Sequence, residues 1–198
     1  MTERVAAVVL AAGGSSRFGS AKQLALHAGE PLVRRAAVAA VDAGASPVFV
    51  VLGARADAVE RALDGLAGVT LLRHEGWAEG LASSLAAGVR AAAADASCDG
   101  VLLTLADQPL VDAAALRTLL HAFGPARRIV AAEYAGTVGA PAVVGREHLD
   151  DLVLRLTGDA GAGRWLRGRL TDVTRVPLPA AALDVDTPAD AARLDRTR

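Results

Sequence analysis

A glycine-rich segment near the start of the chain carries two basic side chains. Residues 10–22 read LAAGGSSRFGSAK, with Gly13 and Gly14 followed by Arg17 and Lys22. Consecutive small residues let backbone N–H groups turn inward and bind an anion. Arg17 and Lys22 add two positive charges, which suits the triphosphate of a nucleotide. The alternative is a flexible surface turn whose two cations are simply solvated.

This loop fits neither of two common phosphate-binding motifs. A P-loop needs a lysine directly after the second glycine of GxxxxG, but Ser20 follows Gly19. The dinucleotide fingerprint GxGxxG would need glycine at Ala12 and at Arg17. A dinucleotide-binding oxidoreductase is therefore disfavoured. The chain holds twenty arginines and one lysine, Lys22, so the position of this lysine in the loop points to a role.

Two acidic segments can supply a divalent cation with oxygen ligands. Asp107 follows the apolar run Gly100–Leu105, and Pro109 prevents the predicted strand from continuing. A carboxylate at the end of a strand can hold Mg²⁺, which prefers oxygen and bridges to substrate phosphates. Asp184 and Asp186 alternate along an extended segment and so share one face. The alternatives are a turn-forming Asp107 and an Asp186 that only caps the next helix.

A third segment, WAEGLASSLAAG from Trp77 to Gly88, opens a predicted helix. Its free N–H groups and the hydroxyls of Ser83 and Ser84 can contact a flat polar ring or an anion, and Gly80 permits close approach. Helix capping and tight packing are the alternatives. Trp77 can cover a ligand or fill a hydrophobic edge, and core packing is the more common use of tryptophan. His74 is typical of an ordinary surface histidine. Cys98 has no histidine nearby in the sequence, which argues against a nucleophilic role.

Apolar runs and helical spacing alternate along the chain. This order predicts a single α/β domain over residues 1–198, a three-layer Rossmann-like mostly parallel sheet with a small C-terminal lobe from about Tyr134. In such sheets ligands bind beyond the carboxyl ends of the strands. The predicted strands are Val5–Ala11, Pro47–Gly53, Val69–Leu72, Gly100–Leu105, Arg128–Glu133, Ala140–Val144 and Val173–Val176. The predicted helices are Pro31–Gly44, Arg55–Leu66, Gly80–Ala94, Asp112–Ala122, Arg146–Leu156, Ala160–Gly168 and Pro188–Leu194, with Asp112 and Thr187 as N-caps.

Composition narrows the class of protein. The chain has 198 residues, of which 53% are hydrophobic and 22% charged, so a buried core is expected. The formal net charge of −1 argues against a nucleic-acid partner and against a polybasic membrane anchor. One cysteine excludes an internal disulfide. With no apolar run near the length of a membrane span, a cytoplasmic protein is expected.

Four of these segments together resemble one family. LAAGGSSRFGSAKQL is similar to the LAAGxSxRxGxxKxL signature of nucleotidyltransferases related to molybdenum-cofactor cytidylyl- and guanylyltransferases, a MobA-like family. ADQP and DVDTPAD resemble further motifs of that family, and WAEGLASSLAAG resembles a segment of its cytidylyltransferase branch. The resemblance implies that Asp107 is the main ligand of Mg²⁺ and that Asp186 is the second ligand. It also implies catalytic roles for Arg17, Lys22 and Asp107. The nucleotide-binding residues that it implies are Leu10, Ala11, Ala12, Gly13, Gly14, Arg17, Lys22, Gly80, Ser83 and Ser84.

Two later segments resemble the family but depart from its pattern. Residues 136–141 and 156–164 are similar to the family's GxxGHP and LxGDxGAR motifs, where the acceptor is expected to bind. Ala140 stands where the family has histidine, and Gly163 where it has arginine. Arg164, Arg167 and Arg169 can bind an anionic acceptor, or they can form a solvated basic face.

The resemblance implies transfer of CMP from CTP to molybdopterin or its molybdenum complex, with release of pyrophosphate. Possible partners are CTP or another NTP, a molybdopterin-type acceptor, and a molybdoenzyme or its chaperone. One alternative is transfer of GMP or another NMP to a different phosphorylated acceptor, such as a sugar phosphate or phospholactate. Another is a non-catalytic nucleotide-binding or cofactor-binding chaperone of a molybdoenzyme.

Overall fold

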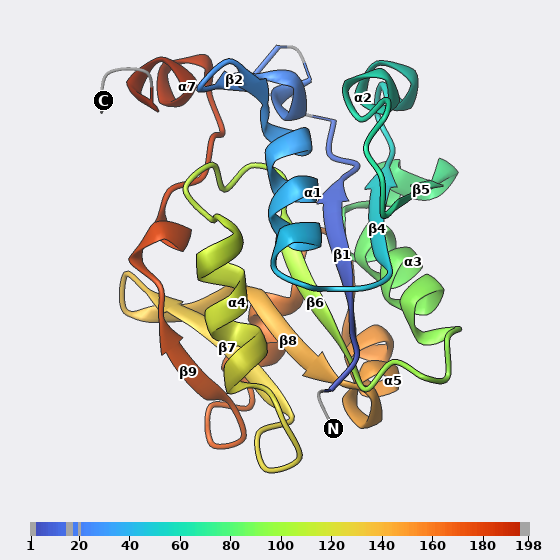
Figure 1. Ribbon diagram of the computed structural model, residues 1–198, viewed down its shortest axis with the longest axis vertical. Helices are drawn as coiled ribbons and strands as arrows, with labels where there is room; N and C mark the ends of the chain where they lie inside the picture. The colour runs from blue at the N-terminus through green and yellow to red at the C-terminus, as the bar shows by residue number, and fades with distance from the viewer. Residues whose placement is uncertain (1–2, 15–17, 20, 195–198) are drawn as a thin grey trace.

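The computed structural model describes residues 3–14, 18–19 and 21–194. A seven-stranded sheet crosses the centre of the molecule (Figure 1). In chain order its strands are β1 (Val5–Ala11), β4 (Val48–Leu52), β5 (Val69–Arg73), β6 (Gly100–Leu105), β7 (Ile129–Tyr134), β8 (Thr137–Gly145) and β9 (Thr174–Pro177). A separate two-stranded ribbon consists of β2 (Leu26–His27) and β3 (Glu30–Pro31).

The sheet is mixed but mostly parallel, as predicted. Its strand order is β5-β4-β1-β6-β8-β7-β9, and only β8 runs antiparallel to its neighbours. Strand β1 is buried at every position and pairs with β4 on one side and β6 on the other. The carboxyl ends of β1, β4 and β6 therefore meet at one edge, the upper edge in Figure 1.

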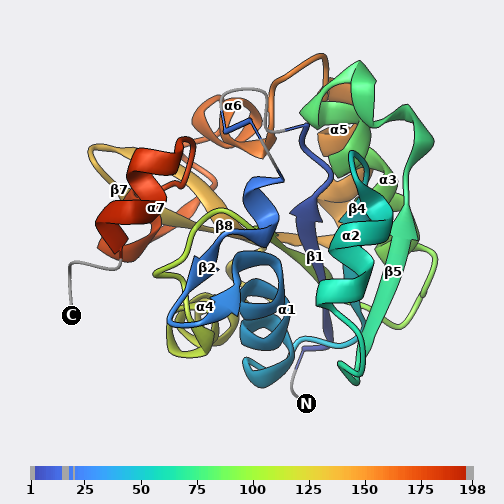
Figure 2. The ribbon, with the colours of Figure 1, turned by 90° about the horizontal axis from the view of Figure 1, so that it is seen from above.

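Helices cover both faces of this sheet (Figure 2). In chain order they are α1 (Leu32–Asp42), α2 (Ala56–Ala62), α3 (Leu81–Ala93), α4 (Ala113–Ala122), α5 (Arg146–Arg155), α6 (Ala162–Arg167) and α7 (Pro188–Leu194). Three 3₁₀ turns, η1 (Lys22–Leu24), η2 (Glu75–Glu79) and η3 (Pro179–Ala182), connect them to the strands. Helices α1 and α4 lie on one face, and α3, α5 and α6 lie on the other.

Alternation along β1 supplies both hydrophobic cores. Val9 packs in the core that contains Val33 of α1 and Leu116 of α4. Val8, the next residue back, packs in the opposite core with Leu85 of α3. Because successive side chains of a strand point to opposite faces, a run that is apolar throughout is the pattern of a strand covered by helices on both sides.

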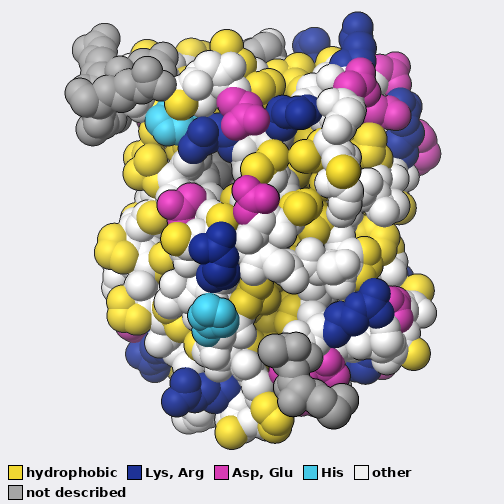
Figure 3. Space-filling model, viewed as in Figure 1, with side chains coloured by type: hydrophobic (Ala, Val, Ile, Leu, Met, Phe, Trp, Pro, Cys, Tyr) yellow, Lys and Arg dark blue, Asp and Glu magenta, His cyan; other side chains and the backbone are white. Residues whose placement is uncertain are grey.

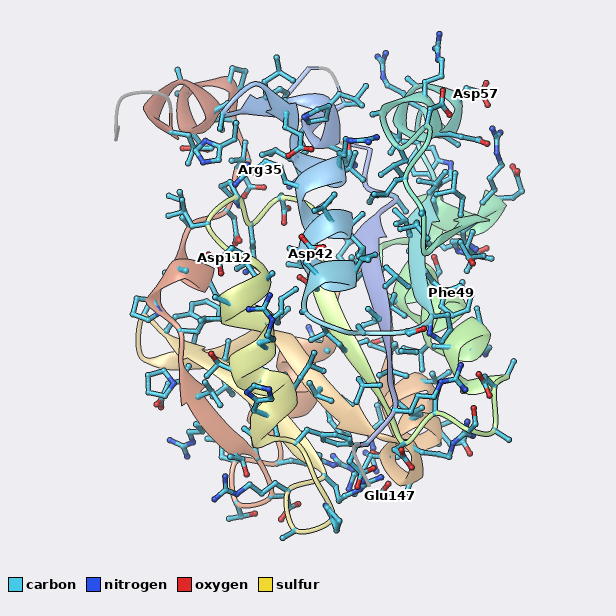
Figure 4. All side chains as sticks on the ribbon, in the orientation of Figure 1. Arg35, Asp42, Phe49, Asp57, Asp112 and Glu147 are labelled. Atoms are coloured by element: carbon cyan, nitrogen blue, oxygen red, sulfur yellow. The ribbon has the colours of Figure 1, made fainter. Side chains whose placement is uncertain are left out.

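The predicted boundaries agree closely in the strands and less closely in the helices. The ranges of β1, β6 and α7 are as predicted. Helix α2 is shorter than the predicted Arg55–Leu66 at both ends. Arg55 has a left-handed backbone with φ 57° and precedes the helix, and the helix ends at Ala62, three residues before Gly65 with its positive φ of 73°. The predicted N-cap of α4 is confirmed: Asp112, labelled in Figure 4, accepts a hydrogen bond from the Ala115 amide at 2.8 Å.

The last third of the chain extends the sheet rather than only covering it. Strands β8, β7 and β9 add three positions beyond β6. Strand β8 begins at Thr137, three residues before the prediction, because Ala135 and Gly136 both have positive φ and form the two-residue turn of a β7–β8 hairpin. Gly136 and Gly139, which bracket Thr137 and Val138, obscured this strand in the sequence.

Candidate functional site

The loop after β1 is tied to its surroundings by a buried glutamine. Gln23, only 2% exposed, donates its amide hydrogens to the carbonyl oxygens of Ala11 at 3.1 Å and Gly13 at 2.7 Å. These bonds fix the backbone from Ala11 to Gly13 directly beyond the strand. The sequence analysis did not select Gln23, although it stands beside Lys22 in the AKQL segment.

Lys22 joins the two acidic segments. Its ammonium nitrogen lies 2.5 Å from Asp107 Oδ2 and 2.8 Å from Asp186 Oδ1, although these residues are 85 and 164 positions away in the chain. Burial acts to lower the pKa of Lys22, but the charges and hydrogen bonds of Asp107 and Asp186 outweigh it and raise that pKa. The Lys22 amine therefore stays protonated, and both carboxylates contact it.

Backbone contacts hold the two carboxylates at this point. The Val185 amide donates to the Asp107 carbonyl at 2.9 Å, so the segment from Asp184 to Asp186 runs along the end of β6. Gln108 is 3% exposed, and its amide donates to the carbonyls of Ala140 at 3.2 Å and Ala181 at 2.9 Å. This residue therefore ties the end of β6 to β8 and to η3.

The predicted cap of α7 adds to this support. Thr187 Oγ1 accepts a hydrogen bond from the Asp190 amide at 3.3 Å. The Asp190 carboxylate in turn accepts from the Thr187 amide at 2.8 Å and the Thr187 hydroxyl at 2.7 Å. This reciprocal arrangement is a capping box, with aspartate in place of the usual glutamate. The cap is thus made by Thr187 and Asp190, while the Asp186 carboxylate faces Lys22.

The donor set fits a divalent cation that is shared with a substrate. Asp107 Oδ1 is buried and has no hydrogen-bond partner among the described residues. No group of three or more His, Cys, Asp or Glu in the described ranges is placed to hold a metal. Two carboxylates without a protein cage are the arrangement in which Mg²⁺ completes its coordination with phosphates and water.

Asp184 is the third carboxylate of this region. The protein surrounds part of its carboxyl group, although the residue as a whole is exposed. This desolvation, followed by the negative charges of Asp107 and Asp186, raises the pKa of Asp184 to about 6. Desolvation is the larger cause of this shift, and the negative charges of Asp107 and Asp186, which contribute to it, would also attract a cation.

A cavity of about 350 Å³ opens beside Lys22, between the loop after β1 and the start of α3, and is called the main cavity of this site below. Among the predicted site residues, those that line it are Leu10, Ala12, Gly13, Gly14, Lys22, Gly80, Ser84 and Asp107. Lining residues that the sequence analysis did not assign to the site are Gln23, Trp77, Ala78, Leu81, Leu105, Ala106 and Asp159. The structure thus brings together the loop, the carboxylate of Asp107 and the serine-containing helix start around one cavity.

Three predicted residues within the described ranges stand outside that lining. Ala11 is buried behind the loop, where its carbonyl binds Gln23. The Ser83 hydroxyl turns away, to the carbonyls of Gly76 and Gly80 at 2.9 Å each. Asp186 reaches the site through Lys22. Arg17 lies outside the described residues.

Glycines at two positions allow the walls of this cavity to approach each other. Gly80 has φ 111°, and a Cβ there would come within 2.5 Å of the Gly158 carbonyl oxygen, which accepts from the Ala82 amide at 2.9 Å. A Cβ on Gly53 would come within 2.5 Å of Trp77 Cβ. Trp77 therefore packs against the end of β4 while its ring lines the cavity.

The other two residues weighed in the sequence have structural surroundings. His74 Nε2 lies 3.1 Å from the Ser83 hydroxyl, so this histidine contributes to the start of α3. Cys98 is buried, and burial raises the pKa of its thiol, which keeps it protonated and unreactive.

Two features of the molecule as a whole bear on its partners. None of the described helices combines the length and apolar character that crossing a bilayer requires. On the face drawn in Figure 3, acidic and basic side chains lie intermixed rather than gathered by sign.

Comparison with known proteins shows relatives that match nearly the whole chain. Nicotine blue oxidoreductase of Paenarthrobacter nicotinovorans is 34% identical over 194 residues, which cover 92% of each chain. The crystal structure of Rv0371c from Mycobacterium tuberculosis H37Rv has a TM-score of 0.82 at 32% identity and covers 100% of both chains. A complex of Rv0371c with manganese has a TM-score of 0.76 at 29% identity, again over 100% of both chains.

A third relative is described by its activity. A nucleotidyl transferase from Methanothermobacter thermautotroptrophicus has a TM-score of 0.82 at 26% identity, covering 98% of this chain and 99% of that one. The model of the MobA-like NTP transferase domain matches residues 7–174, which include the loop after β1, the start of α3 and Asp107. The chain therefore belongs to the MobA-like NTP transferase domain family and is a nucleotidyltransferase of that family.

Proposed function

We propose that this protein transfers CMP from CTP to molybdopterin, or to its molybdenum complex, and releases pyrophosphate. The observation that carries the proposal is the meeting of Lys22, Asp107 and Asp186 at the rim of the main cavity. A polyphosphate bound there would contact a cation on one side and a metal-binding carboxylate pair on the other. The resemblance of residues 77–88 to the cytidylyltransferase branch supports cytosine as the base.

The main cavity supports a division of roles. The backbone from Ala12 to Gly14 would hold the nucleotide phosphates, and Lys22 would neutralise the charge that develops on the leaving pyrophosphate. Gly80 and Ser84 would contact the base or the ribose. We include Arg17 as a second phosphate-binding cation, on the family motif alone.

Mg²⁺ fits the carboxylates of Asp107 and Asp186 and, when bound, would withdraw negative charge from the α-phosphate. The manganese complex of the relative Rv0371c supports a divalent cation as a cofactor. Asp107, with its unpartnered and buried Oδ1, would be the main ligand. Asp186 would complete the protein's share of the coordination.

The reaction needs alignment more than acid–base chemistry. An oxygen of the acceptor phosphate, already an anion at neutral pH, forms a bond to the α-phosphorus. The bond from that phosphorus to the oxygen bridging the α- and β-phosphates breaks, and the electron pair leaves with pyrophosphate. Alignment of two bound phosphates can lower such a barrier by about 7–11 kcal/mol. No proton has to be abstracted, so Lys22 can remain protonated throughout.

The test is pyrophosphate release measured with CTP, GTP, ATP and UTP in turn, each with and without molybdopterin. Release with CTP only in the presence of molybdopterin supports the proposal. Release with GTP would instead indicate GMP transfer. Tight CTP binding without release for any acceptor, including sugar phosphates and phospholactate, would indicate a binding protein that delivers nucleotide or cofactor.

A second candidate function rests on the relative from P. nicotinovorans, which is named as an oxidoreductase and matches 92% of this chain. In that case the main cavity would bind a nicotinamide nucleotide by its phosphates. The discriminating measurement is the absorbance of a reduced nicotinamide nucleotide mixed with nicotine blue and the protein. Protein-dependent dye reduction, together with no pyrophosphate release, would favour this function over nucleotidyl transfer.

A further inference from the structure

A second, smaller pocket lies beside the main cavity. Its volume is about 170 Å³, and it shares the walls formed by Leu10, Leu81 and Leu105 with the main cavity. A molecule seated in this side pocket would therefore lie next to a nucleotide bound near Lys22. This position suits the non-reacting part of an acceptor.

The side pocket is mostly apolar. Aliphatic side chains and glycines form its floor and walls, and the polar side chains at it are Tyr134, Thr137 and Arg167. Within the described part of the chain, no acidic side chain lines it. Ala140, at the position where the family motif has histidine, adds to this apolar character. The pocket therefore favours a compact ring over a polar chain.

The structure separates the three arginines that follow Gly163. Arg169 pairs with the Asp151 carboxylate and stacks over the Trp165 ring with 4.7 Å between the guanidinium carbon and the ring centre. Arg164 is exposed and does not line the side pocket. Arg167 does line it and makes no ion pair with any described residue. Of these three arginines, only Arg167 both lines the side pocket and has no ion pair with a described carboxylate.

Gly163 makes room for this arginine. A Cβ on Gly163 would lie 3.0 Å from Arg167 Nη1, so the guanidinium lies against the backbone of Gly163. This is the position where the family motif carries its own arginine. The guanidinium missing from position 163 is thus supplied from one helical turn further along α6.

We propose that Arg167 is a specificity-determining residue for the acceptor: it pairs with an anionic group of the acceptor, whose flat ring occupies the side pocket. This inference rests on the proposed function only in calling the bound molecule the acceptor. A guanidinium at the mouth of an apolar pocket binds such an anion more strongly than the same guanidinium would in open solvent.

A binding experiment tests this assignment without turnover. The probe is 1-anilinonaphthalene-8-sulfonate, which joins an aromatic ring system to one anionic group, and its uncharged parent N-phenyl-1-naphthylamine is the comparison. In Arg167→Gln we expect the dissociation constant of the sulfonate to rise about tenfold, as for loss of one charge-assisted contact. Binding of the uncharged parent should change less than about twofold.

Arg164→Gln is the matched control, because it removes the same charge from the same helix away from the pocket. We expect it to leave both dissociation constants within about twofold of the unsubstituted protein. Equal weakening in the two variants, or unchanged sulfonate binding in Arg167→Gln, would overturn the assignment. Both side chains are exposed, so neither substitution should prevent folding.

A kinetic arm links the residue to the reaction. With CTP and molybdopterin, Arg167→Gln should raise KM for molybdopterin about tenfold and leave KM for CTP within about twofold. Unchanged KM for molybdopterin would contradict the role of Arg167 as a specificity determinant. If the unsubstituted protein releases no pyrophosphate, the proposed function fails. Binding of 1-anilinonaphthalene-8-sulfonate still decides whether Arg167 binds an anion at the side pocket.

Discussion

At the scale of single residues, the site depends on three charged groups that the chain brings together from distant positions. Asp107 and Asp186 both hydrogen-bond to Lys22, and Gln23 fixes the loop beside them. The charged members of this group could be selected from the sequence, because the glycine loop with its lone lysine and the aspartate that ends a strand match motifs of the family. Gln23 could not, because its role is to bind two backbone carbonyls whose positions exist only in the folded loop.

Replacement of Asp107 by asparagine should abolish most of the activity and preserve the fold. The substitution keeps the size of the side chain but removes the charge that would hold the metal. We expect kcat to fall about a hundredfold or more, the usual effect of losing one preorganised electrostatic contact. Pyrophosphate release at saturating CTP and Mg²⁺ measures it.

The matched control is Asp112→Asn, which makes the same chemical change at the N-cap of α4, where asparagine caps as well as aspartate. This variant should keep full activity and an unchanged melting temperature. Activity that survives in Asp107→Asn at saturating Mg²⁺ would remove Asp107 from the metal site.

Replacement of Lys22 by methionine should strengthen metal binding in the absence of nucleotide. The ammonium occupies the point between Asp107 and Asp186, so it competes with a dication for the same carboxylates. We expect the Mn²⁺ dissociation constant, measured by titration calorimetry, to fall several-fold. KM for CTP should rise in the same variant, because a phosphate contact is lost. Weaker Mn²⁺ binding would mean that Lys22 supports the metal site rather than competing for it.

At the scale of elements, the packing of a helix against the sheet explains residues that helix propensity does not predict. Helix α3 crosses β1 and β4 at Gly88, where a Cβ would lie 2.5 Å from Val8 Cγ1 and 2.9 Å from Val51 Cγ2. The sequence predicts the helix and offers tight packing as one reason for a glycine within it, but it does not show against which element the helix packs. The reason is the close approach of α3 to the sheet, which also sets where Gly80 and Ser84 meet the cavity.

Gly88→Ala should therefore destabilise the protein, although alanine is the better helix former. Helix propensity favours alanine by about 1 kcal/mol, whereas overpacking a buried contact costs about 1–3 kcal/mol. The stiff valines of the strands leave little room to relax. We expect a net loss of about 1 kcal/mol, measured by urea denaturation.

Gly124→Ala is the control for that measurement, because a Cβ at Gly124 would meet no atom within 4 Å. Its stability should stay within about 0.5 kcal/mol of the unsubstituted protein. A Gly88→Ala variant as stable as this control would show that α3 can move away from the sheet at no cost.

At the scale of the whole molecule, the sequence predicted the order of elements better than their edges. Strands β1 and β6 are buried on both faces and are therefore almost continuous apolar runs. The ends of such runs can be located in the sequence alone. The β7–β8 hairpin and the ribbon of β2 and β3 depend on turns and short pairings, which are visible only once the strands lie side by side. After β9 the chain returns to the end of β6, where the Val185 amide binds the Asp107 carbonyl. This contact likewise depends on long-range packing.

Acid stability is the whole-molecule property that the structure predicts most directly. Asp151 connects α5 to α6: its carboxylate accepts from Arg155 Nε at 2.8 Å and Trp165 Nε1 at 2.7 Å, and it pairs with Arg169. The hydrogen bonds of Arg155 and then Trp165 lower the pKa of Asp151 to about 2, from 3.8. A carboxyl group whose pKa is lower in the folded state binds its proton more readily when unfolded.

The stabilising effect of Asp151 should therefore be complete above about pH 4 and disappear as the pH falls toward 2. Urea midpoints measured across this range should fall more steeply for the unsubstituted protein than for Asp151→Asn, which has no charge to lose. Asp150→Asn, an exposed neighbour on the same helix, should follow the unsubstituted curve. Parallel curves for the unsubstituted protein and Asp151→Asn would show that the α5–α6 contact does not depend on this carboxylate. The apolar contacts of Trp165 would then hold the two helices together by themselves.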